Sequence, residues 1–320
     1  MGLFGKSWTW KKQPTAAERR SARRAARTQT AKEKTAGLPD ALESPFFDEL
    51  AAEWPNEPTL KTPVSQMCTA SQFDEPDYAR ICEIFDIRPR LQRKQWEFVF
   101  IYRAIEAAGL IEPGRRGIAF GVGRERMPSV LSKRKVDVVA TDLPVQEANG
   151  YWVKSNQHAN SVETLYRQNL TEREDFDRHV SFRPVNMKSI PADLRGFDFC
   201  WSACALEHLG DLEAGFDFIR ASLDTLKPGG VAAHTTEFNL GSDETTLESG
   251  STVVYRRSDI LRLTEELRAD GHTVSVNLSP GRTPTDRMID RLRTTEIHLR
   301  LYVKHQIPAT SIGLIVRKAA

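Results

Sequence analysis

The chain has no apolar segment near the roughly 18 residues that span a bilayer, and its first residues lack the apolar core of a secretory signal. It has only four cysteines, without the spacing of a disulfide framework. These absences predict reduced thiols and a cytoplasmic location. The apolar fraction of 40% and the charged fraction of 28% are ordinary for a globular protein of 320 residues.

Acidic residues are scarce at the start of the chain. Residues 1–37 carry ten Lys or Arg and two acids, which leaves 35 basic and 41 acidic residues in the rest. This composition predicts a basic, disordered tail over 1–37. Leu3, Phe4, Trp8 and Trp10 stand beside lysines, so peripheral contact with an anionic membrane is the alternative.

From residue 113 on, strand patterns alternate with helical patterns, which predicts parallel strands joined by crossover helices. Residues 38–112 have several prolines and then helical spacing, and they predict an N-terminal helical cap on a 113–320 domain. We therefore expect an α/β fold with a doubly wound, mostly parallel, seven-stranded sheet. The expected strands are 116–120, 136–141, 180–185, 197–201, 230–236, 272–276 and 311–317, with helices at 126–133, 159–169, 211–227 and 257–270.

The stretch GIAFGVGRERMPSV at 117–130 lacks the third small residue of a dinucleotide fingerprint, because Arg126 stands there. Gly121 allows a sharp turn after the strand, and Gly123 lets the backbone approach a ligand closely. The loop suits a nucleoside ligand without a pyrophosphate. Asp142 ends the next strand, where a carboxylate accepts hydrogen bonds from both ribose hydroxyls; a turn cap before Pro144 is the alternative.

The segment that begins with the fourth expected strand carries a more specific pattern. It reads FDFCWS at 197–202, LEHL at 206–209 and LKPGG at 226–230. In this order the motifs resemble class I S-adenosylmethionine-dependent methyltransferases, which implies a Rossmann-like fold, an antiparallel last strand and S-adenosyl-L-methionine as cofactor. That cofactor contains adenine, ribose and methionine but no phosphate. A broader resemblance is to bacterial methyltransferases associated with surface-glycan genes, in segments such as RKQWEF and HTTEFN.

The resemblance also implies cofactor contacts. Asn186 stands where the family commonly has an acid facing adenine, Met187 is placed to pack on the adenine face, and Ser202 ends the FDFCWS strand. Arg124 and Glu125 are candidates for the methionine carboxylate and ammonium. A core position for Met187, and surface positions for Arg124 and Glu125, are the alternatives. The chain departs from the family at Ala119, where an acid is frequent.

Three residues are candidates for catalysis: His208, just after strand four, and His234 and Glu237, at the end of strand five. A histidine takes a proton from a hydroxyl near neutral pH, and a carboxylate beside it orients the ring. This predicts O-methylation of a small hydroxylated molecule or a sugar or glycan. His158 also lies near the expected mouth, but no compact ligand spacing predicts a metal site.

Two other functions stay open. The basic tail favours an RNA methyltransferase, although neither a Pro-Pro-Tyr motif for base amines nor a Pro-Cys nucleophile occurs after strand four. A non-catalytic cofactor-binding scaffold that recruits partners through its tail is the other alternative. The sequence does not predict an oligomeric state.

Overall fold

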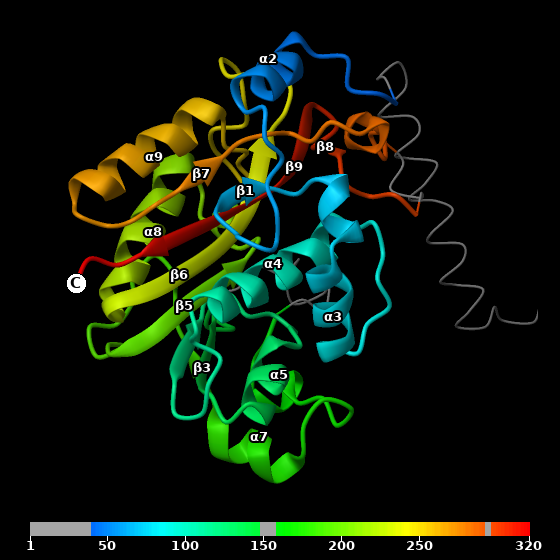
Figure 1. The fold of residues 1–320 in the computed structure, drawn as a ribbon. Helices are drawn as coiled ribbons and strands as arrows, with labels where there is room; N and C mark the ends of the chain where they lie inside the picture. The colour runs from blue at the N-terminus through cyan, green and yellow to red at the C-terminus, as the bar shows by residue number, and fades with distance from the viewer. Residues whose placement is uncertain (1–39, 148–157, 292–295) are drawn as a thin grey trace, which may run out of the picture.

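A computed structural model describes residues 40–147, 158–291 and 296–320, so the predicted tail over 1–37 lies outside the described residues. The described chain forms one nine-stranded sheet in the order β4-β3-β2-β5-β6-β9-β1-β7, with β8 paired to β9 (Figure 1). The strands are β1 Ser65–Met67, β2 Arg116–Ala119, β3 Asp137–Asp142, β4 Val180–Pro184, β5 Phe197–Ala203, β6 Leu226–Asn239, β7 Val276–Asn277, β8 Leu301–Val303 and β9 Ile307–Arg317.

The central strands run as the sequence predicted. Strands β2 to β6 pair in parallel, and β9 is antiparallel to β6. The mostly parallel α/β fold is therefore confirmed. Because the carboxyl ends of parallel strands meet at one edge, this arrangement brings together the segments that follow β2, β3 and β5.

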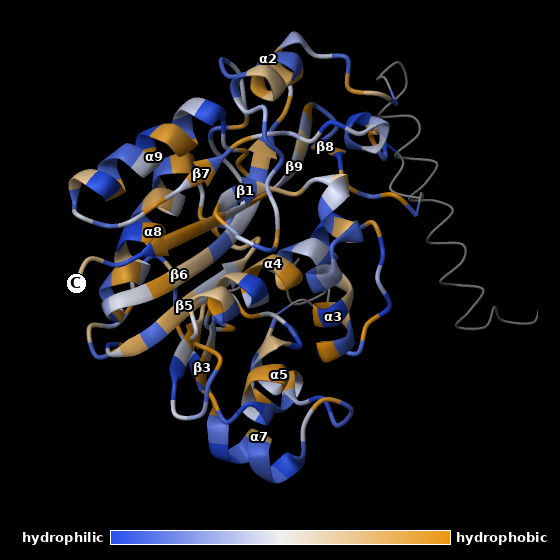
Figure 2. Cartoon of the chain, in the orientation of Figure 1, coloured by the Kyte–Doolittle hydropathy of each residue, from blue (hydrophilic) through white to orange (hydrophobic). Residues whose placement is uncertain are grey.

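Helices cover both faces of the sheet, because successive side chains of its buried strands alternate between two cores. Ile118, Cys200 and Ala232 belong to the core shared with α2, α8 and α9, whereas their neighbours Ala119, Trp201 and Ala233 belong to the core shared with α3, α4, α5 and α7. In Figure 2 the outlying α7 is largely hydrophilic, and only its Phe176 is buried. The helices are α2 Pro45–Glu53, α3 Pro76–Ile84, α4 Arg93–Ala107, α5 Met127–Lys133, α7 Arg173–His179, α8 Leu212–Asp224 and α9 Arg257–Ala269.

The N-terminal helical cap expected over 38–112 also contains a strand, β1. This strand lies between β9 and β7, so the N-terminal segment contributes to the same sheet as the rest of the chain. β1 is only three residues long and buried throughout, and it therefore has no alternating pattern that reveals a strand. The expected strand at 272–276 shrinks to β7, Val276–Asn277, at the sheet edge.

The expected helix at 159–169 is also wrong. Only a 3₁₀ turn, Val162–Leu165, forms within it, and the helix on that side of the sheet is α7. Over the described ranges, no helix combines the length and apolarity needed to cross a membrane.

Candidate active site

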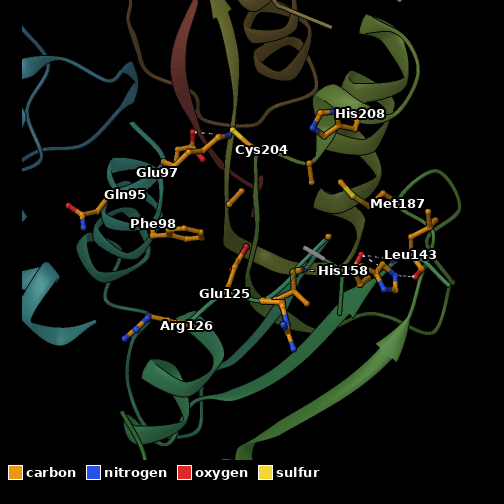
Figure 3. Close-up of a pocket in the computed structure, with 18 of the residues that line it drawn as sticks. Gln95, Glu97, Phe98, Glu125, Arg126, Leu143, His158, Met187, Cys204 and His208 are labelled. Carbon is orange, nitrogen blue, oxygen red and sulfur yellow. Dashed lines mark hydrogen bonds and ion pairs between the residues drawn. The ribbon is translucent and has the colours of Figure 1, made fainter. Parts of the chain in front are cut away.

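A cavity of about 690 Å³ opens at the carboxyl ends of β2, β3 and β5, and residues 85–98, from the end of α3 to the first turns of α4, form its opposite wall. Figure 3 shows Phe98 on one side, Met187 and His158 on the other, and Glu125 between them. Nine residues singled out in the sequence line this cavity: Gly121, Gly123, Arg124, Glu125, Asp142, His158, Asn186, Met187 and His208.

The loop after β2 requires glycine at its two central positions. Gly121 and Gly123 have φ values of +60° and +52°, in the left-handed region that glycine adopts without strain. A Cβ atom on Gly121 would lie 2.8 Å from the Cβ of Ala205 and 3.3 Å from the Sδ of Met187. A side chain there would therefore both strain the backbone and fill the space that the loop leaves beside β5.

Asp142 holds this loop against the end of β3. Its carboxylate accepts the backbone N–H groups of Gly123 at 3.0 Å, Leu143 at 2.8 Å and Ala159 at 3.0 Å. A carboxylate offers about four acceptor positions, so about one remains for a ligand. The predicted pair of ribose hydrogen bonds therefore requires a hydroxyl to replace one of these backbone donors.

Glu125 is a buried carboxyl in the cavity wall. Its Oε2 accepts the indole N–H of Trp201 at 2.9 Å, and 7% of the residue is exposed. Burial raises the pKa of Glu125 to about 8, and the carboxylates of Asp142 and Glu97 add to this rise. The neighbouring Arg126 turns away and donates to the carbonyl of Phe85 at 3.0 Å.

Asn186 already has partners at the rim of the cavity. Its Nδ2 donates to Glu147 at 2.7 Å, and its Oδ1 accepts the backbone N–H of Lys188 at 2.9 Å. Met187 lies beside the glycine loop and is 7% exposed. An adenine amino group at this place would have to share the Asn186 carbonyl with the Lys188 backbone.

His208 lines the cavity from the 3₁₀ turn after β5, and its side chain is 25% exposed. Nδ1 lies 2.7 Å from the carbonyl oxygen of Ser251. Because a carbonyl only accepts, Nδ1 carries the proton in the neutral ring, and Nε2 is the nitrogen able to accept one. Nε2 lies 3.9 Å from Oε1 of the buried Glu207.

The placement of His234 and Ser202 at the cavity was wrong. Both are fully buried, and the Ser202 hydroxyl lies 2.8 Å from Nδ1 of His234, whose Nε2 lies 3.1 Å from the Ser222 hydroxyl on α8. Burial lowers the pKa of His234 to about 3. His234 points to the α8 face because alternate residues of β6 do so, and it therefore cannot reach a ligand at the strand ends.

Glu237 points to the other face of β6 and does not line the cavity. Its Oε1 accepts from the Arg93 guanidinium of α4 at 2.7 Å. Although burial opposes this, the charges of Arg93 and Lys94 hold the pKa of Glu237 below its usual value. The prediction of Glu237 as the orienting carboxylate was therefore wrong in position, since the carboxylate nearest to His208 is Glu207.

The sequence analysis quoted RKQWEF, residues 93–98 at the start of α4, only for its resemblance and selected none of its charged residues for the site. The Lys94 ammonium lies 3.3 Å from Oε1 of Glu97 and 3.8 Å from Oε1 of Glu237, and both Lys94 and Glu97 line the cavity. Arg93 and Glu97 are four residues apart and both are buried. That spacing puts both charges on one face with Phe100, and charges on an otherwise apolar helix face were the available signal.

One group of possible metal ligands occurs in the described residues. Ligand atoms of Cys204, Glu207 and Glu237 lie within 4.8 Å of one another. However, Arg93 and Lys94 already supply two positive charges beside it. Burial and the Glu207 carboxylate raise the pKa of the Cys204 thiol, which keeps this thiol protonated and makes it a poor metal ligand.

No protein-family model matches the chain, and no curated protein matches it in sequence. Solved structures do resemble it. An S-adenosylmethionine-dependent methyltransferase from Clostridium acetobutylicum is 14% identical, with a TM-score of 0.41 over 76% of this chain and 99% of that one. Magnesium protoporphyrin IX methyltransferase from Synechocystis, with bound S-adenosylhomocysteine, is 13% identical, with a TM-score of 0.39 over 78% of this chain and 97% of that one.

A third similar structure, an O-methyltransferase family protein from Burkholderia thailandensis, is 13% identical, with a TM-score of 0.37 over 76% of this chain and 68% of that one. The class of fold follows from the sheet itself. Parallel strands β4-β3-β2-β5-β6 are continued by the antiparallel β9, and the glycine loop follows the central β2. The chain therefore has a Rossmann-like α/β fold.

Proposed function

We propose that the protein binds S-adenosyl-L-methionine in this cavity and transfers the methyl group to a hydroxyl of a small molecule or sugar. The observation that carries the proposal is that one cavity joins the glycine loop and Asp142 to His208 of the LEHL motif. The cavity can therefore bind a nucleoside without a phosphate and also offers a histidine that can accept a proton.

The cofactor has a natural orientation in this cavity. In this proposal Asp142 binds the ribose, the loop from Gly121 to Glu125 binds the methionine portion, and Asn186 with Met187 contacts adenine; all of these residues line the cavity. This order follows the strand ends from β2 to β4. It leaves the space between the β5 end and α4 for the acceptor.

The acceptor side has a mixed lining. Phe85, Ile87 and Phe98 provide apolar surface, and Gln92 and Lys94 provide hydrogen-bond donors. Such a lining suits a small molecule with an apolar face and several hydroxyls. His208 acts as the general base through Nε2. The remaining rate enhancement comes from holding the acceptor hydroxyl in line with the sulfonium.

The test combines binding and transfer. Calorimetry measures S-adenosylhomocysteine binding, and labelled methyl groups from S-adenosylmethionine are followed into pools of sugars, glycans and hydroxylated metabolites. We expect binding together with a labelled product. Because methylation of a hydroxyl gives an ether, alkali should not release the label from this product. Failure to bind S-adenosylhomocysteine would remove the proposal, and binding with no transfer to any pool would favour the scaffold alternative.

A further inference from the structure

Glu125 is an acid without a cation in a site proposed for a cationic ligand. One carboxyl oxygen accepts from Trp201, and no hydrogen bond or ion pair is made by the other oxygen within the described part of the chain. The residue lines the cavity and points between Phe98 and His158 in Figure 3. Ionisation of a buried carboxyl is energetically costly unless a cation lies beside it.

The charged groups around Glu125 do not provide that cation. From α4 the cavity receives Glu97 and Lys94, and the Lys94 ammonium lies against Glu97 at 3.3 Å. From the end of β3 comes Asp142, which itself lies 3.9 Å from the His158 imidazole. These neighbours put two further carboxylates near Glu125.

The loop that carries Glu125 also contains two arginines. Arg126 donates to the backbone carbonyls of Phe85 and Asp86, at 3.0 and 3.4 Å, and so faces the end of α3. Arg124 lies at the cavity wall, and its backbone carbonyl accepts from Arg167 at 2.8 Å. Burial, together with Asp142 and Glu97, keeps the pKa of Glu125 at about 8, so the carboxyl is mostly protonated at pH 7 before the cofactor binds.

We propose that Glu125 receives the α-ammonium of the cofactor and gives up its proton when the cofactor binds, so that cofactor binding is coupled to proton release. This inference rests on the proposed function. The protonated carboxyl and the ammonium become a carboxylate–ammonium pair, and the released proton goes to solvent.

The test uses S-adenosylhomocysteine, because it has the ammonium but no sulfonium charge. Calorimetry at pH 7 in buffers of different ionisation enthalpy measures the protons exchanged on binding. We expect release of about one proton, and an affinity that rises close to tenfold per pH unit between pH 6 and about 7.5, before it levels off near pH 8. Methylthioadenosine has no ammonium and should bind without this release.

Two variants localise the effect. Glu125→Gln still offers a carbonyl oxygen to Trp201, and it should abolish proton release and weaken S-adenosylhomocysteine about tenfold at pH 8. Glu147→Gln changes an acid that bonds Asn186 at the rim, and it should release the same proton as the wild type. A thermal melt of each variant checks that it is folded.

The wild-type measurement decides the matter even where a variant fails to fold. Binding of S-adenosylhomocysteine with no proton exchange between pH 6 and 7.5 would overturn this inference and leave the proposed function standing. Unchanged proton release in Glu125→Gln would also overturn it. A wild-type protein that does not bind S-adenosylhomocysteine would overturn both.

Discussion

His208 is the residue on which the proposed chemistry depends. Its Nδ1 hydrogen bond to Ser251 places the accepting lone pair on Nε2. His208→Ala should lower methyl transfer by about 10²–10⁴-fold, as for loss of a general base, with S-adenosylhomocysteine affinity nearly unchanged. Labelled-methyl transfer and calorimetry measure the two effects. The matched control is His179→Ala, since His179 pairs with Asp137 outside the cavity. Near-wild-type turnover of His208→Ala would exclude His208 as the general base.

His234 makes a separate prediction about acid stability. Its pKa falls from 6.5 to about 3 on folding because of burial, so the unfolded chain binds the extra proton between these values. The free energy of unfolding should therefore drop as pH falls from about 6.5 towards 3, by up to about 1.4 kcal/mol per pH unit from this group. Urea unfolding between pH 4 and 7 measures how the free energy of unfolding changes with pH. This change should be smaller for His234→Asn than for the wild type, and an equal change in both proteins would contradict a neutral buried His234.

Asp142 connects binding to folding. Asp142→Ala removes the acceptor for three backbone N–H groups, and each hydrogen bond to a charged group contributes about 1.5–3 kcal/mol. We expect a lower melting temperature without ligand, and S-adenosylhomocysteine binding at least tenfold weaker. Unchanged affinity in a folded variant would show that Asp142 only holds the loop.

Among the elements, β1 decides how the N-terminal segment belongs to the fold. It is hydrogen-bonded between β9 and β7, and the Cys68 N–H just after it donates to Ser311 at 2.9 Å. Cys68→Pro removes this donor and leaves a buried carbonyl unpaired, so the free energy of unfolding should fall by about 2–4 kcal/mol. Cys68→Ala tests the side chain alone, and equal denaturant midpoints for both variants would count against the role of the strand.

Helix α4 is the element that links this N-terminal segment to the cavity. It packs on β5, β6 and β9, and its Arg93 pairs with Glu237 of β6. Lys94, Glu97 and Phe98 of the same helix line the cavity. The acceptor side of the site therefore depends on a segment that precedes the glycine loop and the FDFCWS, LEHL and LKPGG motifs.

At the scale of the whole molecule, charge is divided unevenly along the chain. Residues 1–37 have a surplus of eight positive charges over negative ones, and the rest of the chain has an acidic surplus. We propose that this segment contributes location and not catalysis. Deleting 1–37 should leave the melting temperature and cofactor affinity nearly unchanged and should reduce co-sedimentation with anionic vesicles. Equal sedimentation of both proteins would exclude the membrane contact.

The parallel sheet, the glycine loop and the position of Asp142 could all be predicted from the sequence, because they depend on local patterns. Strand alternation, glycine with positive φ and a strand-end acid each involve only a few neighbouring residues. The same holds for His208, which follows β5 within the LEHL motif and does line the cavity. Local spacing was sufficient wherever the strand end itself placed the side chain.

Only the tertiary structure decided which faces the remaining side chains share. His234 and Glu237 are three residues apart on one strand and therefore point to opposite faces, one against Ser222 of α8 and the other against Arg93 of α4. The pairing of β1 with β9 joins residues about 245 positions apart, and no local pattern encodes such a contact. The same reason applies to the second wall of the cavity, which α4 forms. Lys94 and Glu97 lie opposite the glycine loop because of long-range packing and not because of their spacing along the chain.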